Sequence, residues 1–472
     1  MDRRHFLRTL ATGALAGQAS GAASHPRPNV LFVLMDDLGW HDLAPYGNQF
    51  IDTPNLTRFA QESVRFTQAY AACPVCSPTR ASILTGQYPA RLHLTDWIPG
   101  RKQWPSAKLL MPRFEQFLPT AHKTIAEILR PAGYRTAAIG KWHLGGDGHL
   151  PTDRGFQVNI AGTAAGHPPS YFGPLRLPGL ELKPGEFLTQ RLTDDAIRFM
   201  RAYPATPFFL YLAHFTVHLP LEAREDAIAK YRNRDTGDVN PTYCAMVESA
   251  DDSMGQLMKA LDDSGLANNT IVIFFSDNGG VRYQARQPKP ITDNRPLRAG
   301  KGHVFEGGIR EPLMIKWPGV TRGGAVVDDA VISTDFLSTI CECTGTLIRG
   351  ADDGRSLVRL LRGHTQGTRP LFWHYPHYSD QGGRPAAAVR DGEWKLIRFY
   401  EDDRLELYDL QNDPGERRNL IRLERARARR LNDSLTYWLH AVDAAMPMPN
   451  PAYDPKTASE GLTGYEPPTP PV

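Results

Sequence analysis

The chain has 472 residues, of which 41% are apolar, and a mean hydropathy of -0.39, as expected for a soluble globular protein with a sizeable core. The formal net charge of +3 is too small to indicate a nucleic-acid partner, and no basic run with interleaved aromatic residues is present. Five cysteines in this length do not make a disulfide scaffold. One pair could still bridge, but Cys341 and Cys343 are too close in sequence for an easy mutual bond.

The first residues have the layout of an export signal. The segment DRRHFLR (residues 2–8) precedes a mildly apolar run and then small residues, and its Arg-Arg pair with Phe-Leu resembles a twin-arginine signal. The run is too short and too rich in Gly and Ala to span a membrane, and no other segment is a candidate. We predict a signal peptide over residues 1–24, the alternative being a disordered basic tail, and a periplasmic or secreted protein without membrane insertion.

Apolar runs of strand length alternate with helical patterns along the next part of the chain. Strands buried on both faces are predicted at residues 29–35, 134–139, 207–213 and 270–275, with a further strand at 313–317. Helices are predicted at residues 55–66, 124–129, 188–203 and 243–264. This alternation predicts an α/β fold with a large, mostly parallel central sheet flanked by helices.

Polar side chains follow each of the four buried strands. They are Asp36-Asp37, Lys141 with His143, His218, and Asp277-Asn278. Ligands of open α/β sheets bind beyond the carboxyl ends of the strands, so we expect these clusters to meet in one cleft. Adjacent carboxylates repel each other unless a cation lies between them, which predicts a metal site there.

A cysteine lies at the predicted entrance of a helix. Ser77 suits the N-cap, Pro78 the first helical position and Gly86 the exit. Cys76 would then lie where backbone N–H groups and the helix dipole favour negative charge, and Arg80 adds a fixed cation. The pattern favours an anionic ligand beside Cys76, the alternative being a buried structural cysteine.

The C-terminal region has a different pattern. Short strands are predicted at residues 371–378, 386–390, 394–400 and 405–410, followed by an NDPG turn and a helix over 417–439. We therefore expect an N-terminal catalytic domain over residues 28–365 and a smaller antiparallel sheet with a helix over 366–445. A Pro-rich tail over 446–472 is expected to be extended or disordered.

The motif Cys76-Ser77-Pro78-Thr79-Arg80, continued by Leu-Thr-Gly, resembles the C-x-P-x-R signature of type I, formylglycine-dependent sulfatases. The GKWHLG string at 140–145 and the LYDLxxDPxExxNL-like string at 407–420 resemble other blocks of this arylsulfatase-like family. The resemblance implies the alkaline-phosphatase-like fold and a sulfuric ester hydrolase. It also implies that a maturase converts Cys76 to Cα-formylglycine, whose hydrate is the nucleophile.

The resemblance also implies roles for individual positions. Asp36, Asp37, Asp277 and Asn278, together with Cys76, match the ligands of one divalent cation, usually Ca²⁺. Arg80, Lys141 and Lys301 match residues that hold the sulfate and formylglycine oxygens. His143 matches the expected base, and His218, with Lys301, matches the donor of a proton to the leaving alcohol.

Export and a long loop over residues 91–120, which contains Trp97 and Arg101, indicate a sulfated carbohydrate as substrate. Ser170 is assigned as a hydroxyl contact, and His374 and His377 as pocket residues from the C-terminal region. One alternative is a phosphodiester or phosphonate monoester hydrolase of the same superfamily. The other is a non-catalytic glycan-binding protein on this fold, which would require an unmodified Cys76 or a missing catalytic residue.

Overall fold

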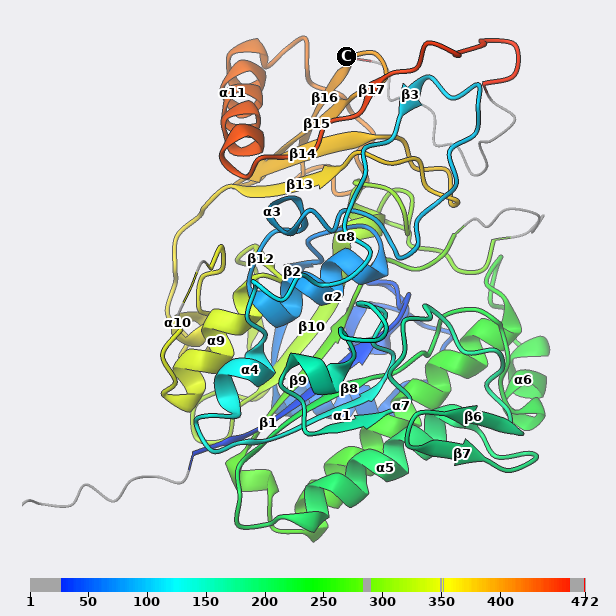
Figure 1. The fold of residues 1–472 in the computed structure, drawn as a ribbon, viewed down its shortest axis with the longest axis vertical. Helices are drawn as coiled ribbons and strands as arrows, with labels where there is room; N and C mark the ends of the chain where they lie inside the picture. Colours follow the sequence, from blue (N-terminus) through cyan, green and yellow to red (C-terminus); the bar gives the residue numbers. More distant parts are fainter. Residues whose placement is uncertain (1–26, 283–289, 349, 351, 459–470, 472) are drawn as a thin grey trace, which may run out of the picture.

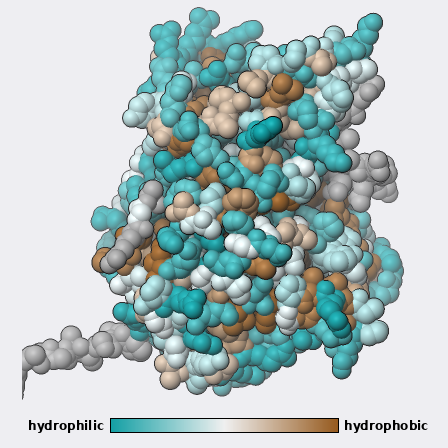
Figure 2. All heavy atoms as spheres, in the orientation of Figure 1, coloured by the Kyte–Doolittle hydropathy of each residue, from teal (hydrophilic) through white to brown (hydrophobic). Residues whose placement is uncertain are grey.

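The computed structural model describes residues 27–282, 290–348, 350, 352–458 and 471 (Figure 1). The predicted export signal, residues 1–24, lies outside these ranges. Within them, no helix combines the length and apolar character that crossing a bilayer requires. The face drawn in Figure 2 is mostly hydrophilic with hydrophobic residues scattered over it, which is the ordinary surface of a folded domain.

The middle of the molecule is a sheet of nine strands, counted over the described residues (Figure 1). In sheet order the strands are β11 (Val326–Val327), β2 (Val64–Tyr70), β10 (Arg310–Lys316), β9 (Thr270–Ser276), β1 (Asn29–Met35), β8 (Phe208–Ala213), β4 (Arg135–Gly140) and β5 (Val158–Ile160), while β12 (Val331–Ile332) pairs with β2. The strand β10 is antiparallel to both neighbours, whereas β9, β1, β8, β4 and β5 are mutually parallel. The predicted mostly parallel sheet is confirmed.

Helices cover both faces of this sheet. In β1, the odd-numbered residues from Leu31 to Met35 belong to one hydrophobic cluster and the even-numbered residues from Val30 to Leu34 belong to another. The first cluster includes α1 (Pro54–Glu62), α5 (Leu188–Ala202), α6 (Glu225–Arg232) and α7 (Pro241–Asp263), and the second includes α2 (Cys76–Thr85), α4 (Ile125–Leu129), α9 (Asp335–Thr344) and α10 (Val358–Leu361). Burial on both faces explains why the central strands are continuously apolar.

The carboxyl ends of four parallel strands lie level with one another. Met35 pairs with Ser276, while Ala213 pairs with Leu34 on one side and Gly140 on the other. The chain positions just beyond these ends therefore share one edge of the sheet; they are Asp36-Asp37, Lys141, Asp277-Asn278 and, after a short loop, His218. This register is the structural basis of the site described below.

The C-terminal part forms a second, antiparallel sheet, as predicted. Its strands in order are β13 (Leu371–Tyr375), β14 (Ala386–Asp391), β15 (Trp394–Phe399) and β16 (Leu405–Asp409), and α11 (Arg425–Ala441) packs against them. Figure 1 shows this unit stacked at one end of the molecule.

Two predicted helix boundaries are wrong. The helix predicted over residues 55–66 ends at Glu62, and Val64–Tyr70 is strand β2. The apolar spacing that ends at Val64 fits a helix, but Val64 and Phe66 are both buried by pairing with β10. The helix predicted from residue 417 begins at Arg425, because Asp413 Oδ2 accepts the N–H groups of Arg417 and Arg418 and holds that segment in a turn.

The first part of the Pro-rich tail packs against the long loop. The strand β17 (Met448–Pro449) pairs with β3 (Leu109–Leu110), and Asn450 Nδ2 donates to the carbonyls of Pro105 and Ala107 at 2.8 and 2.7 Å. The remaining short elements are α3 (Pro89–Leu92), α8 (Glu306–Ile309), the hairpin β6 (Leu175–Leu177) with β7 (Leu180–Leu182), and 3₁₀ turns at Ala44–Tyr46, Pro151–Arg154 and Ala267–Asn269.

A buried charge cluster joins the two sheets. Lys395 Nζ on β15 lies 2.9 Å from Glu306 Oε1 on α8 and 2.9 Å from Glu416 Oε1, and all three side chains are fully buried. Glu416 Oε2 also accepts the backbone N–H of Glu306 at 2.7 Å. Burial raises the pKa of Glu416 to about 7, so the cluster is close to neutral.

We expect Lys395→Met to lower the free energy of unfolding by about 3–5 kcal/mol, because it removes the ammonium group that both buried carboxyl groups contact. The measurement is urea unfolding followed by tryptophan fluorescence. Arg398→Met on the same strand is the matched control, since Arg398 pairs with the exposed Asp403, and it should cost less than about 1 kcal/mol. Equal losses in the two variants would contradict the assigned role of the cluster.

Candidate active site

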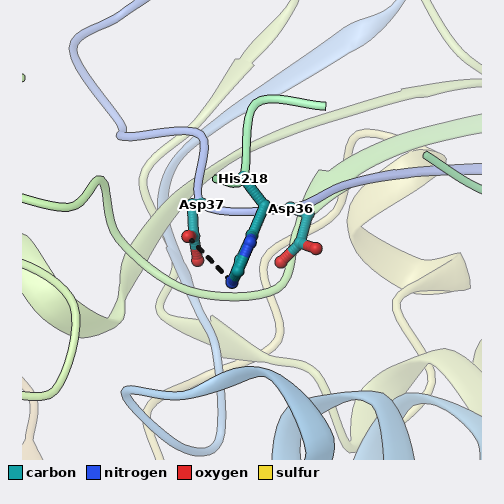
Figure 3. Close-up of side chains that lie close together, drawn as sticks. All are labelled: Asp36, Asp37 and His218. Carbon is teal, nitrogen blue, oxygen red and sulfur yellow. Dashed lines mark ion pairs between the residues drawn. The ribbon is translucent and has the colours of Figure 1, made fainter. Parts of the chain in front are cut away.

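The polar residues beyond the four strands converge at one edge of the sheet. Ligand atoms of Asp36, Asp37 and His218 lie within 4.8 Å of one another, and Figure 3 shows the three side chains around one shared space. Asp277 joins them, since its Oδ1 accepts the backbone N–H of Asp37 at 3.3 Å. Asn278 Nδ2 donates to Asp37 Oδ1 at 2.8 Å.

Three cations neutralise the three carboxylates. Lys141 Nζ lies 2.6 Å from Asp36 Oδ2, and Lys301 Nζ lies 2.6 Å from Asp37 Oδ1. Arg80 Nε donates to Asp277 Oδ2 at 2.8 Å. The carboxylates and Arg80 are fully buried, and the two lysines nearly so, so these pairs keep charged groups stable in the interior.

Three buried oxygens in this cluster lack a hydrogen-bond partner among the described residues. They are Asp36 Oδ1, Asp37 Oδ2 and Asn278 Oδ1. A buried polar atom without a protein partner costs free energy unless an ion or an ordered water binds it. Carboxylate and amide oxygens are the ligands that a hard cation such as Ca²⁺ prefers, so the residues present fit a cation of that kind.

The same cluster shifts the pKa values of its carboxyl groups. Burial, followed by the charge of Asp36, raises the pKa of Asp277 to about 6. Burial also acts to raise the pKa of Asp37, but the charges of Lys301, His218 and Lys141 outweigh it and lower that pKa.

The helix that carries the cysteine begins two residues earlier than predicted from its cap. Val75 is the N-cap and Cys76 the first residue of α2, whereas Ser77 Oγ accepts the N–H of Ile98 at 3.2 Å. The Ser77 cap prediction is therefore wrong, although Cys76 still lies at the helix N-terminus. Burial raises the pKa of the Cys76 thiol, even though Lys141 and Lys301 act in the opposite direction, so the unmodified thiol is neutral.

His143 is aimed at Cys76. Its Nδ1 lies 3.4 Å from Cys76 Sγ, and its Nε2 lies 2.6 Å from the carbonyl of Ile98. Because a carbonyl only accepts, Nε2 carries the proton and Nδ1 presents a lone pair to Cys76. Burial, with Lys141 nearby, holds the pKa of His143 well below its usual value, so the ring is neutral.

His218, like His143, donates one ring N–H to a backbone carbonyl. Its Nδ1 lies 2.9 Å from the carbonyl of Leu219, so Nδ1 donates, and its Nε2 lies 3.6 Å from Asp37 Oδ2. Burial lowers the pKa of His218 to about 3 despite the nearby Asp37. The ring is therefore neutral, with its proton on Nδ1 and a lone pair on Nε2.

Two of these residues have left-handed backbones. The φ angle is 64° at Asp37 and 58° at His143, which is uncommon for residues other than glycine. Such strained positions persist only where surrounding contacts determine them, and they cluster at functional sites.

The cluster opens into a pocket of about 840 Å³. The residues that line it include Asp37, Cys76, His143, His218 and Lys301, together with Trp97, Ile98, Pro99, His167, Asp380 and Gln381. The sequence analysis did not identify His167, Asp380 or Gln381. The only local signal for the last two was the Gly382-Gly383 pair that follows them, which marks a turn but not its place at the site.

The other predicted substrate residues lie outside the pocket lining. Arg101 forms an ion pair with Asp380 at 3.2 Å, and Ser170 Oγ donates to Glu222 at 2.8 Å. His374 is buried between the Tyr400 hydroxyl and the Ala445 carbonyl at 2.7 and 3.0 Å. His377 Nε2 lies 2.8 Å from Thr95 Oγ1, also in the interior. Both histidines pack within the C-terminal unit or against it.

Family models match most of this chain, and solved structures match its fold. The sulfatase family model matches residues 28–346, and the model of the N-sulphoglucosamine sulphohydrolase C-terminal region matches residues 299–443. The chain therefore belongs to the sulfatase family. It is a sulfuric ester hydrolase of the alkaline-phosphatase-like superfamily.

Individual relatives cover most of the chain. A sulfatase of Formosa agariphila is 30% identical over 90% of this chain and 91% of its own length, and human arylsulfatase A is 32% identical over 86% of each. The structure of Ps i-CgsB in complex with k-i-k-neocarrahexaose has a TM-score of 0.76 at 28% identity, covering 88% of this chain and 93% of its own. A phosphonate monoester hydrolase of Agrobacterium radiobacter, at 20% identity, a TM-score of 0.64 and coverage of 88% and 96%, shares the fold.

We expect Gly166→Ala to lower kcat for sulfate ester hydrolysis by about tenfold or more. A Cβ at Gly166 would lie 2.5 Å from His143 Cε1, and small displacements of reacting groups are costly. Gly146→Ala is the matched control, because its Cβ would meet only the Ala164 Cβ, at 3.6 Å. The measurement is turnover of 4-nitrophenyl sulfate alongside Tm; equal turnover in both variants would show that Gly166 does not set the His143 position.

Proposed function

We propose that this sulfatase releases inorganic sulfate from a sulfated carbohydrate, using a formylglycine formed from Cys76 and one bound Ca²⁺. The observation that carries the proposal is the set of partnerless buried oxygens, Asp36 Oδ1, Asp37 Oδ2 and Asn278 Oδ1, close to the residues that surround Cys76. The metal ligands in this proposal are Asp36, Asp37, Asp277 and Asn278, with residue 76 as a further ligand.

The two groups supply chemistry that the unmodified side chains lack. Bound Ca²⁺ would withdraw charge from sulfate oxygens, and a hydrated aldehyde at position 76 would offer one hydroxyl for attack at sulfur and a second for the release of sulfate. A serine or cysteine in the same place would be left as a stable ester after the first step.

Three cations of the chain would stabilise the charge that develops on the sulfate group. Arg80 Nη2 is buried, has no hydrogen-bond partner among the described residues and lies 3.7 Å from Asp36 Oδ2, so an N–H donor remains for a sulfate oxygen. The ammonium groups of Lys141 and Lys301 lie 2.6 Å from Asp36 Oδ2 and Asp37 Oδ1, respectively. Donors preorganised in a buried site lower the barrier because they need no rearrangement during the reaction.

Two histidines would move protons. The lone pair on His143 Nδ1 faces Cys76 Sγ. In the modified protein this sulfur position would be taken by a hydroxyl of the hydrated aldehyde. His143 would therefore accept the proton of that hydroxyl when sulfate is expelled. His218 Nε2 and the Lys301 ammonium face the pocket from the other side. The Lys301 ammonium would deliver a proton to the leaving alcohol, and His218 would join it in the form that also carries a proton on Nε2.

The assignment of a carbohydrate substrate is supported by the pocket and by one relative. Ps i-CgsB, 28% identical to this chain, binds a neocarrahexaose, and the pocket of this chain combines Trp97 with polar groups. The phosphonate monoester hydrolase shares only the fold. The Arg-Arg segment and the apolar run after it support export to the periplasm or beyond by a twin-arginine route, with a maturase acting on Cys76.

We expect the Cys76 peptide of protein purified from its own host to be about 18 Da lighter than the unmodified peptide, because conversion replaces CH₂SH by CHO. Cys76→Ala should lose 4-nitrophenyl sulfate turnover by about 10³-fold or more, whereas Cys341→Ala, a buried cysteine on α9, should retain it. Full turnover by Cys76→Ala would refute the nucleophile, whereas an unmodified thiol in a wild-type protein that hydrolyses no sulfate ester would favour the glycan-binding alternative.

Removal of Ca²⁺ with EGTA should lower both Tm and turnover, and added Ca²⁺ should restore them. A ligand at a hundredfold excess over its Kd stabilises the native state by about 2.7 kcal/mol. Asn278→Leu should abolish the Ca²⁺-dependent rise in Tm, because it removes one of the oxygens without a partner. Full activity in EGTA and a Tm that does not respond to Ca²⁺ would exclude the metal from the proposal.

A further inference from the structure

We propose that Asp96 is a positioning residue for the base His143: it fixes the backbone segment that holds the Ile98 carbonyl against His143 Nε2, and so keeps the lone pair of Nδ1 toward residue 76. The inference rests on the proposed function, in which His143 is the base, and goes beyond it by assigning roles to Asp96 and Tyr375. Neither of these two is among the described residues that line the pocket.

The Ile98 carbonyl determines which nitrogen of His143 carries the proton. Its oxygen lies 2.6 Å from His143 Nε2, while Nδ1 lies 3.4 Å from Cys76 Sγ. If this carbonyl moved away, the neutral ring could also carry its proton on Nδ1, and it would then have no lone pair toward residue 76. The position of one backbone carbonyl therefore sets the fraction of molecules in which the base can act.

The segment that carries this carbonyl belongs to no helix or strand. Residues 95–98 lie between α3 and β3, so no ladder of backbone hydrogen bonds fixes them, and side chains from two other parts of the chain hold them instead. The backbone N–H of Ile98 donates to Ser77 Oγ on α2 at 3.2 Å. At the other end of the segment, Thr95 Oγ1 lies 2.8 Å from His377 Nε2.

The side chain of Asp96 makes the central contact of this segment. Its Oδ1 accepts the backbone N–H of Trp97 at 2.9 Å and the hydroxyl of Tyr375 at 3.0 Å. Asp96 and Tyr375 are both buried, and Tyr375 belongs to β13. Asp96 thus orients the peptide that leads to Ile98 and ties it to the C-terminal sheet.

These contacts require the acceptor oxygen of Asp96 rather than its charge. Both bonds end on Oδ1, which accepts hydrogen bonds in the ionised and in the neutral carboxyl group. Burial raises the pKa of Asp96 to about 7, although the Trp97 N–H and the Tyr375 hydroxyl act in the opposite direction. His377 Nδ1 lies 4.0 Å from Asp96 Oδ2, but burial lowers the pKa of His377 to about 3, so that ring is neutral. Asparagine should therefore replace Asp96, whereas leucine should not.

The first test measures the tautomer of His143 by ¹⁵N NMR of the imidazole nitrogens. It uses the protein with unmodified Cys76, so it does not depend on turnover, and the signals are assigned by their loss in His143→Gln. In the wild-type protein, Nε2 should carry the proton. Asp96→Leu should raise the fraction with the proton on Nδ1 by about tenfold, because it removes the acceptor. Asp96→Asn should keep the wild-type tautomer.

Two tyrosine variants provide a milder change and its control. Tyr375→Phe removes one of the two bonds to Asp96 Oδ1, so its tautomer ratio should lie between those of the wild type and Asp96→Leu. Tyr134→Phe is the matched control, because the Tyr134 hydroxyl donates to the Pro28 carbonyl at 3.0 Å, beyond the amino ends of β1 and β4. It should leave the tautomer of His143 unchanged.

The second test uses the formylglycine-bearing protein and 4-nitrophenyl sulfate. His143 acts when sulfate is expelled, after 4-nitrophenol has left, whereas kcat/KM reports only the steps up to the departure of the first product. Asp96→Leu should therefore lower kcat by about tenfold or more and change kcat/KM by less than about twofold. A general loss of structure would lower both. Asp96→Asn and Tyr134→Phe should keep the wild-type values.

Three results would overturn the inference. They are a wild-type tautomer ratio in both Asp96→Leu and Tyr375→Phe, an equal fall of kcat and kcat/KM in these variants, or a loss in Asp96→Asn as large as that in Asp96→Leu. If Asp96→Leu does not fold, Tyr375→Phe decides. A wild-type protein that carries formylglycine and hydrolyses no sulfate ester would refute the proposed function, while the NMR measurement would still decide whether Asp96 positions the ring.

Discussion

The structure depends on the balance of charge beyond the carboxyl ends of the parallel strands. Asp36, Asp37 and Asp277 carry three negative charges in a fully buried cluster, and Arg80, Lys141 and Lys301 carry three positive ones. Removing either sign would leave uncompensated charge in the interior, which is strongly destabilising. Because the six groups already cancel, the divalent cation that we propose would leave the pocket positive, as the binding of an anionic sulfate ester requires.

To bring these charged side chains together, several backbone segments must lie very close to one another. The sequence has glycine at the points of closest contact. A Cβ at Gly140 would lie 1.9 Å from the Ala213 carbonyl oxygen, so β4 delivers Lys141 next to β8 only with glycine there. Glycine at position 166 likewise leaves room for the ring of His143. Asp37 and His143 have left-handed backbone conformations. This local strain persists because it directs both side chains into the site.

The C-terminal unit completes the site as well as packing against it. The Lys395 cluster joins β15 to α8, the helix that begins five residues after Lys301, while residues 379–383 contact the Lys301 turn from the other side. The wall that faces a substrate is therefore built from segments that are far apart in the chain. Variation in the C-terminal unit is a route by which such a fold can change its substrate while the sulfate-binding centre stays constant.

The amino-acid sequence by itself determined the local elements and which polar residues gather beyond the ends of the parallel strands. Strands such as Asn29–Met35 and Thr270–Ser276 are continuously apolar because both faces are buried, and the polar residues beyond them are readable as a cluster from fold rules alone. Where a local pattern was compatible with two structures it failed, as at Val64, whose spacing suits a helix although it lies in β2.

Only the tertiary structure decided the partners of each side chain. His374 and His377 are aromatic and polar, as a pocket residue would be, yet packing places both in the interior. Asp380 and Gln381 carry no distinctive pattern, yet the contact between Gly302 and Ser379 brings them to the pocket wall. The physical reason is that hydrophobic periodicity records which face of an element is buried, whereas contacts between residues hundreds of positions apart depend on how the elements pack together.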